Sequence, residues 1–176
     1  MRVRPFAERS DYERMIDYFL DADDARLLAM GVDRRKLPAR STWVESAMAD
    51  HLRPEAQKDR FYLGWIYEDE MIGHSSINQI RMGEEAHIHL HLWSGDHRKA
   101  GLGTQYFKAS AAEFIRMFGL KRLYCEPYAE NPAPNRVLLK CGFRLLKRYR
   151  TVPGVINFEQ DVNQYVWEPT VDTLRI

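Results

Sequence analysis

The sequence predicts a single α+β domain built on a mixed central sheet of about seven strands flanked by helices. Its 176 residues suit one domain, which at this size buries about 70% of its unfolded surface. The expected order is strand, helices, three-strand meander, helix, strand, helix and two strands. This order lacks the regular alternation of a doubly wound parallel sheet. We therefore treat residues 1–176 as one domain.

The first sixty residues predict one strand and three helices. Ser10 or Asp11 is suited to cap the first helix, within which apolar residues recur at helical spacing. The acidic segment 21–24 is expected to divide the helical stretch, and Gly31 to end its second part. The expected elements are a strand over 2–6, two helices between 11 and 31, and a helix over 41–51.

The rest of the chain predicts a meander followed by two helices and three more strands. Hairpin-length turns join the first three strand candidates, so these should be antiparallel. The expected elements are strands over 60–67, 71–80 and 85–93, a helix over 103–118, a strand over 121–128, a helix over 134–141, and strands over 143–152 and 160–169.

The composition excludes several classes of partner. The 26 Lys and Arg residues nearly balance 25 Asp and Glu residues, for a net charge of +1, so we expect no nucleic acid and no anionic membrane surface as partner. No apolar run approaches the ~20 residues of a membrane span, and the first fifteen residues lack the apolar stretch expected of a signal peptide. Cys125 and Cys141 lie among apolar residues, and we expect both to be reduced and structural in a cytoplasmic protein.

Two glycines stand between a strand candidate and a helix candidate, in the segment Arg-Lys-Ala-Gly-Leu-Gly over 98–103. Because glycine loses much backbone entropy on folding, this placement needs a reason. The plain alternative is a tight turn. The other is an anion site, in which the main-chain N–H groups of residues 99–104 converge at a helix start. The segment fits neither a Walker loop nor a Rossmann fingerprint, whose third glycine is replaced by Tyr106.

This segment resembles the acyl-CoA pyrophosphate loop of the GNAT acyltransferase superfamily, whose pattern is Arg/Gln-x-x-Gly-x-Gly/Ala. Residues 131–143 resemble the family's second motif, an Asn followed eleven residues later by Gly-Phe. The two motifs occur in the family's order, and the resemblance covers about residues 85–143. It is nearest to the branch of ribosomal-protein N-terminal acetyltransferases.

The resemblance implies an N-acetyltransferase that moves an acetyl group from acetyl-CoA to a primary amine of a small molecule or peptide. It implies direct attack assisted by a general base, a sheet splayed in its middle, and no metal. It divides the chain into acceptor-side helices (1–60), a cofactor-binding core (60–143) and C-terminal strands (143–176). A non-catalytic acyl-CoA-binding module is the alternative, and a homodimer is left open.

The resemblance also assigns cofactor-binding residues. Main-chain groups of Leu92 and Trp93, which are expected to lack other partners at the open strand edge, would pair with the pantetheine arm. Asn131 would bridge the split strands and the thioester arm, and Asn135 would take over a capping bond, because Pro134 replaces the family's small Ser. The full set is Leu92, Trp93, Arg98, Lys99, Ala100, Gly101, Leu102, Gly103, Thr104, Asn131 and Asn135.

Acetyl transfer needs a base, because an alkyl amine with a pKa of about 10.4 is protonated at neutral pH. The family often places a Glu five residues before the motif's Asn, which here is Glu126. The family's Tyr acid sits seven residues after that Asn, where this chain has Leu138. The usual acid is therefore missing. Tyr128 is a substitute candidate, although a thiol leaves without strong assistance.

Three histidines, His87, His89 and His91, share one face of a strand candidate because side chains alternate along a strand. Three interpretations stay open: a polar sheet face, an acceptor site or base, and a zinc site. The last would make the chain a zinc-dependent hydrolase. His91 is the better base candidate, because it lies nearest the expected splay.

The acceptor is expected to meet the first sixty residues. The segment 21–38 carries acidic and basic clusters a few positions apart, which favours a small amino compound or a peptide N-terminus over a polyamine. The acidic residues 21, 23 and 24 are either a solvated helix junction or an attraction for a cationic amine. Five aromatic residues are expected to pack in the core: Tyr12, Phe19, Trp43, Trp65 and Trp167.

Overall fold

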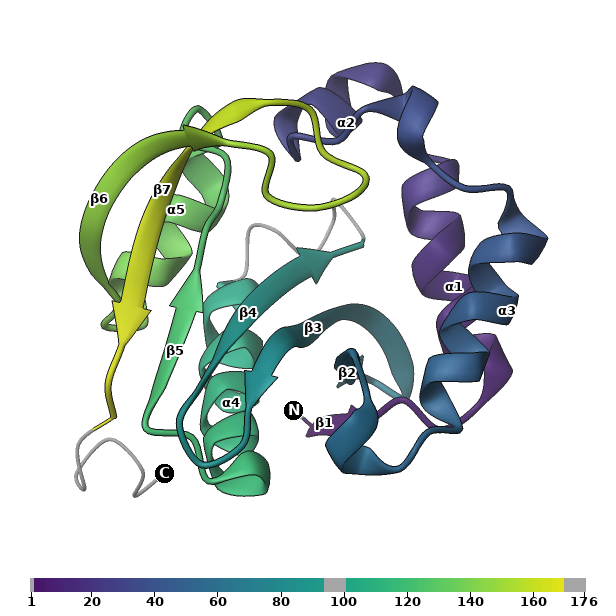
Figure 1. Ribbon diagram of the computed structural model, residues 1–176, viewed down its shortest axis with the longest axis horizontal. Coiled ribbons are helices and arrows are strands. Elements are labelled where there is room, and N and C mark those ends of the chain that lie inside the picture. The colour runs from purple at the N-terminus through teal and green to yellow at the C-terminus, as the bar shows by residue number, and fades with distance from the viewer. Residues whose placement is uncertain (1, 94–100, 170–176) are drawn as a thin grey trace.

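Seven strands form one sheet in the order β1-β2-β3-β4-β5-β7-β6 (Figure 1). The structure is a computed structural model that describes residues 2–93 and 101–169. The β4–β5 pair is parallel, and the other five described pairs are antiparallel, so the prediction of a mixed α+β fold is confirmed. The strands are β1 Arg2–Pro5, β2 Arg60–Tyr67, β3 Glu70–Arg81, β4 Glu85–Leu92, β5 Arg122–Cys125, β6 Arg144–Thr151 and β7 Gln160–Trp167.

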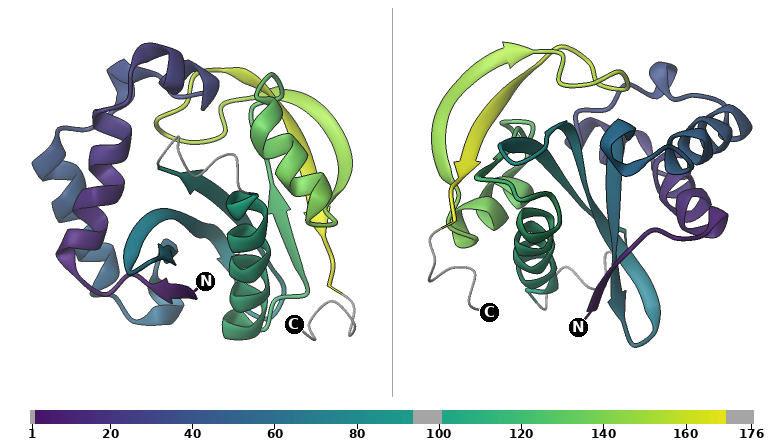
Figure 2. Two further views of the ribbon diagram at one scale, coloured as in Figure 1. Left: turned by 180° about the vertical axis from the view of Figure 1, so that it is seen from behind. Right: turned by 60° about the horizontal axis from the view of Figure 1, so that its bottom comes forward.

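Helices cover both faces of the sheet. Figure 2 shows α4 and α5 on one side and α1, α2 and α3 on the other. The α-helices are α1 Arg9–Leu20, α2 Asp24–Ala29, α3 Arg40–His51, α4 Leu102–Phe118 and α5 Pro132–Lys140. No helix in the described ranges is both long and apolar enough to span a bilayer.

Several helix boundaries follow from capping. The predicted division of the first helical stretch is confirmed, because the Asp23 side chain accepts the Arg26 N–H at 2.7 Å and starts α2. The predicted cap of α1 was wrong. Glu8 is the N-cap, and Asp11 lies in the first turn, where its side chain accepts the N–H groups of Ala7 and Glu8.

Two further boundaries differ from the expectation. Helix α5 begins at Pro132 rather than 134, since the Asn131 side chain caps it and proline suits the first helical turn. Strand β5 ends at Cys125, not 128, and Tyr128 returns to the sheet only as an isolated bridge to Val162.

The sheet is splayed between β4 and β5, as predicted. The two strands pair only from Glu85 opposite Arg122 to His87 opposite Tyr124. Beyond His87, β4 continues to Leu92 without β5 beside it. The backbone edge of residues 88–92 therefore faces a gap instead of a strand.

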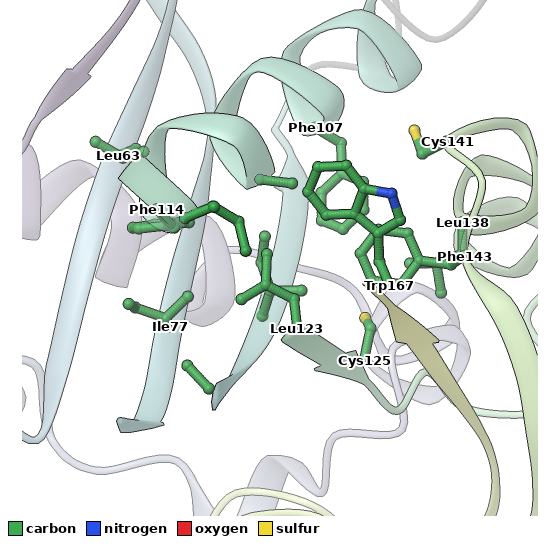
Figure 3. Packing of buried hydrophobic residues seen from close by; sticks show 14 of the residues in the cluster. Leu63, Ile77, Phe107, Phe114, Leu123, Cys125, Leu138, Cys141, Phe143 and Trp167 are labelled. Carbon is green, nitrogen blue, oxygen red and sulfur yellow. The ribbon is translucent and has the colours of Figure 1, made fainter. Parts of the chain in front are cut away.

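The larger core fills the space between the sheet and helices α4 and α5 (Figure 3). Trp65 stacks on Tyr106 with ring centroids 5.6 Å apart, and its indole N–H reaches Ser110 at 3.0 Å. Cys125 and Cys141 are both free and buried in this core. Burial raises the pKa of both thiols, that of Cys141 to about 11, which agrees with the prediction of reduced, structural cysteines.

A second core joins α1, α2 and α3 to the opposite face of the sheet. Of the five aromatic residues expected in the core, Tyr12, Phe19, Trp65 and Trp167 are buried, whereas Trp43 is only partly buried. Trp43 lies at the edge of this core and lines a cavity beside it.

The loop between β6 and β7 reaches across the molecule to α2 (Figure 1). The Gly31 carbonyl accepts hydrogen bonds from the side chains of Asn157 and Gln160, each at 2.8 Å. Gly31 follows α2 with φ +72°, and a Cβ at this position would stand 2.1 Å from the Gln160 side chain. This residue ends the helix as predicted, and it also makes room for the loop.

Candidate active site

A cavity of about 1320 Å³ runs along the splayed edge of the sheet. Helices α1 to α3 and strands β2 to β4 contribute one part of its lining. The start of α4, the segment 125–128, helix α5 and the loop 153–157 contribute the other part. The cavity therefore connects the expected acceptor-side helices with the glycine-opened end of α4.

The sheet floor of this cavity is polar and is built by cross-strand pairing. Three residues each of β2, β3 and β4 point toward α1 and α3, because side chains alternate along a strand. The pairing places them in three rows: Arg60, Asn78 and His87; Tyr62, Ser76 and His89; Gly64, His74 and His91. The alternate residues face α4, which confirms that Ile88, Leu90 and Leu92 belong to the core side.

Three histidines of this floor, His74, His89 and His91, are neutral. Burial, together with the Arg60 guanidinium, lowers the pKa of His89 to about 3 and that of His91 to about 4. Burial also lowers the pKa of His74 well below its usual value. The His89 ring donates Nε2–H to the Asn78 side-chain carbonyl at 3.0 Å, since a carbonyl oxygen can only accept.

His91 is held by an aromatic cluster. Its ring stacks on that of His74 with centroids 4.9 Å apart. The Phe19 ring makes a T-shaped contact with it, with centroids 5.0 Å apart. Its Nδ1 lies 3.4 Å from the Tyr18 hydroxyl. A neutral imidazole in this setting can accept a proton, but its conjugate acid is strong, so it is a weak base.

The zinc alternative finds no support in the geometry. Within residues 2–93 and 101–169, no three His, Cys, Asp or Glu side chains are arranged to hold a metal ion. His89 and His74 instead have protein partners, Asn78 and the Trp93 indole respectively.

Glu126 lines the cavity directly after β5. Its Oε1 accepts the Tyr149 hydroxyl at 2.8 Å and the Gln164 amide at 2.5 Å. Burial and the neighbouring carboxylate raise the pKa of Tyr149 to about 12, so Tyr149 remains a donor. Among the described residues, both donors meet one oxygen of Glu126, and the other oxygen has no hydrogen-bond donor.

The two residues considered as acids lie in different surroundings. Tyr128 lines the cavity, and its ring makes a T-shaped contact with that of Phe158, with centroids 5.8 Å apart. Leu138, which stands where the family has its Tyr, is completely buried in the core. Helix α5 therefore contributes packing, not a proton donor, at that position.

The first turn of α4 presents main-chain N–H groups beside the cavity. Gly101 is the N-cap with φ +70°, and no side chain within residues 2–93 and 101–169 caps this end of the helix. A Cβ built on Gly101 or Gly103 would meet no atom of the described residues within 4 Å. Leu102 packs against the core and anchors the turn, while Gly101, Gly103 and Thr104 line the cavity. The predicted residues Arg98, Lys99 and Ala100 lie outside the described residues.

Leu92 and Trp93, the two strand-end residues predicted to pair with the pantetheine arm, differ in how far their main-chain groups are already hydrogen-bonded within the protein. Leu92 lines the cavity at the splayed edge. Trp93 already has partners for both main-chain groups, because its N–H donates to Ile72 at 2.8 Å and its carbonyl accepts from Arg26 at 2.5 Å. The expectation that the backbone of Trp93 would lack partners was wrong.

The two asparagines of the second motif have structural partners. Asn131 lines the cavity, but its Oδ1 caps α5 and its Nδ2 donates to the Ala29 carbonyl at 2.8 Å. Asn135 is buried and makes four hydrogen bonds. It donates to the carbonyls of Tyr128 and Asn131 and accepts from the side chains of Asn163 and Tyr165. The structure therefore gives the cap to Asn131 and leaves Asn135 no free polar atom.

Sequence reasoning missed three arginines of the cavity, Arg26, Arg60 and Arg136. Strand alternation could have placed Arg60 on the face of Tyr62, but Arg26 needed the tertiary structure. The basic cluster that was expected to face the acceptor is instead paired locally, Arg34 with Asp24 and Arg35 with Asp33.

A mixed sheet, splayed beside a helix that opens on glycine, defines the GNAT class of acyltransferase folds. The family model for the acetyltransferase (GNAT) domain matches residues 1–144. The chain therefore belongs to the GNAT acetyltransferase family, whose members are acetyl-CoA-dependent N-acetyltransferases. The family match favours the enzyme over the non-catalytic binding module.

Solved structures agree on the fold across nearly the whole chain. An acetyltransferase from Salmonella typhimurium that modifies the N-terminal serine of ribosomal protein L7/L12 is 18% identical, covers 96% of this chain and 94% of its own, and has a TM-score of 0.75. Spermidine N-acetyltransferase from Vibrio cholerae, in complex with CoA and spermine, is 15% identical, covers 95% of this chain and 94% of its own, and has a TM-score of 0.74. The microcin C7 self-immunity acetyltransferase MccE, in complex with acetyl-CoA and AMP, is 17% identical, covers 95% of this chain and 92% of its own, and has a TM-score of 0.72. No curated protein matches the sequence significantly.

Proposed function

We propose that this protein transfers the acetyl group of acetyl-CoA to a primary amine by direct attack, with Glu126 as the general base. The observation that carries the proposal is the continuous cavity, which joins the splayed β4 edge and the uncapped start of α4 to the polar sheet floor. A thioester and an amine entering from the two sides would meet at the splay. A homodimer and a cytoplasmic location stay predictions.

The described residues fit acetyl-CoA. Gly101 and Gly103 leave open space where any side chain would stand, so an anionic diphosphate can approach the N–H groups at the positive end of the helix dipole. Arg136 and Lys140 of α5 line the same part of the cavity and add positive charge. When bound, the cosubstrate supplies an activated acetyl group. The unpaired edge of residues 88–92 offers main-chain groups to its amide-bearing arm.

Glu126 is better placed than His91 to remove the amine proton. Tyr149 and Gln164 hold its carboxylate through one oxygen, the residue lines the cavity, and the other oxygen would take the proton. His91 is a weak base because burial lowers its pKa to about 4. The departing thiolate needs a proton from water or from Tyr128, which also lines the cavity.

The experiment is a comparison of Glu126→Gln with Glu130→Gln, an exposed carboxylate that pairs with Arg148. Acetyl-CoA binding is measured by calorimetry and turnover by thiol release over an amine panel. We expect Glu126→Gln to lose about 10²-fold or more in turnover with unchanged acetyl-CoA affinity, and Glu130→Gln to retain both. Full activity of Glu126→Gln from about pH 6 to 9 would place the base elsewhere, with His91 as the next candidate.

A further inference from the structure

Arg60 is a cation that faces the cavity without a carboxylate partner. It begins β2 in the row of Asn78 and His87, and it lines the cavity. Among the described residues, no Asp or Glu oxygen lies within salt-bridge distance of its guanidinium, whereas Arg53, Arg116 and Arg148 each have one. An arginine keeps its charge at any physiological pH, so this cation needs an anion or water.

The acidic residues beside Arg60 are already engaged. Asp50 accepts three N–H groups: the main-chain groups of Asp59 and Arg60, at 2.9 and 3.1 Å, and the Arg53 guanidinium, at 3.4 Å. Asp59 pairs with Arg53 at 2.7 Å. These two carboxylates therefore meet the backbone of Arg60 and another arginine, while the Arg60 side chain meets the neutral Tyr62 hydroxyl and keeps its charge uncompensated.

The strand residues around Arg60 supply hydrogen-bond donors, and the engaged carboxylates of Asp50 and Asp59 line the cavity beside them. None of the nine floor residues is an Asp or Glu. Because His89 donates to the Asn78 carbonyl oxygen, the Asn78 amide nitrogen is left to donate elsewhere. Ser76 adds a hydroxyl in the neighbouring row. A guanidinium near an amide N–H and a hydroxyl matches the lone pairs of a carboxylate or phosphate.

A second cation, Arg26, lines the same cavity. Its guanidinium donates to the Trp93 carbonyl and lies over the Tyr18 ring at 4.6 Å, and its Nε is buried without a partner among the described residues. Both arginines act on the His91 ring electrostatically. A polyamine carries several positive charges and would be repelled by both.

We propose that Arg60 binds an anionic group, a carboxylate or a phosphate, on the amine acceptor. This inference rests on the proposed function and deepens it by naming the acceptor class. The acceptor then carries an amine at the splay and a negative charge farther along the sheet floor. The rows of His91 and His87 are four residue steps apart along β4, at about 3.3 Å for each step. An acceptor whose amine and anionic group are well separated therefore fits better than a compact one.

The test compares acids with their neutral isosteres. The probes are 3-aminopropanoate and 6-aminohexanoate with their carboxamides, Ser-Glu and Ser-Gln peptides with amidated C-termini, and phosphoethanolamine with ethanolamine. The last pair separates a phosphate preference from a carboxylate preference. Each is assayed with the native protein, Arg60→Gln and the control Arg116→Gln, an exposed arginine of α4 paired with Glu113.

We expect at least one acid to exceed its neutral partner tenfold in kcat/KM, which is about 1.4 kcal/mol. The preference should disappear in Arg60→Gln, mainly through KM, and persist in Arg116→Gln. Equal use of acids and amides by the native protein, or an unchanged preference in Arg60→Gln, would overturn the inference. Selective acetylation of a polyamine would overturn it as well.

A binding measurement separates this inference from the proposed function. The CoA-loaded protein is titrated calorimetrically with each acid and its neutral partner. Selective binding of an acid that is lost in Arg60→Gln, without turnover of any amine, supports the anion site and contradicts acetyl transfer. Turnover of amines without any acid-selective binding contradicts the anion site alone.

Discussion

Replacing Asn135 by alanine should destabilise the fold without weakening cofactor binding. The side chain makes four hydrogen bonds, at 3.1, 2.6, 2.8 and 2.9 Å, that join the segment before α5, the start of α5 and β7. At about 1 kcal/mol net for each bond, the loss is about 4 kcal/mol. For a domain of this size 1 kcal/mol corresponds to about 2–4 °C in Tm, so we expect Tm to fall by about 8–16 °C.

The assay is thermal unfolding with and without acetyl-CoA, together with calorimetry below Tm. Asn131→Ala is the matched control. It removes one helix cap, which is worth about 1 kcal/mol, and a single bond to Ala29. A Tm within about 2 °C of the native value, combined with weakened acetyl-CoA binding in Asn135→Ala, would refute this reasoning and restore Asn135 as a cofactor-binding residue.

Two further predictions concern the glycine turn and the histidine floor. Gly101→Ala and Gly83→Ala should each lower the free energy of unfolding by about 1–2 kcal/mol, since both glycines have φ near +70° and no described atom near an added Cβ. Only Gly101→Ala should also weaken acetyl-CoA binding, by about tenfold. Equal acetyl-CoA affinity of the two variants in calorimetry would contradict diphosphate binding by this turn. Because His89 and His91 have pKa values below those of the unfolded chain, the unfolded state binds more protons below about pH 6.5, so stability should fall as the pH drops from there toward 4. Urea unfolding should show a flatter decline for His91→Gln, and an identical decline would contradict the neutral assignment.

The fold was predictable because its signals are local. Alternating apolar residues set the three meander strands, glycines with positive φ end α2 and α4, and the segment 21–24 supplies the cap that separates α1 from α2. The errors lie where another side chain decides the boundary. Helix α5 starts early because Asn131 caps it, and the cap of α1 moves to Glu8 because Asp11 turns back to bond its N–H.

The site was predictable only where it depends on backbone conformation. The glycine turn and the splay follow from short motifs, and Glu126, His91 and Tyr128 all line the cavity. The partners that orient Glu126, Tyr149 and Gln164, come from β6 and β7, and no sequence spacing links them to it. The charges facing the acceptor could not be read from sequence either, because Arg34 and Arg35 pair locally.

Strand β7 lies between β5 and β6 although it is the last strand of the described chain. During synthesis, β5 therefore emerges from the ribosome well before the strand that covers its edge. Until residues 160–167 follow, Tyr165 and Trp167 are missing from the core, and the open β5 edge is a template for pairing with other chains. A stalled or truncated chain that ends near residue 144, where the family match ends, would thus be left with an aggregation-prone sheet rather than a smaller domain.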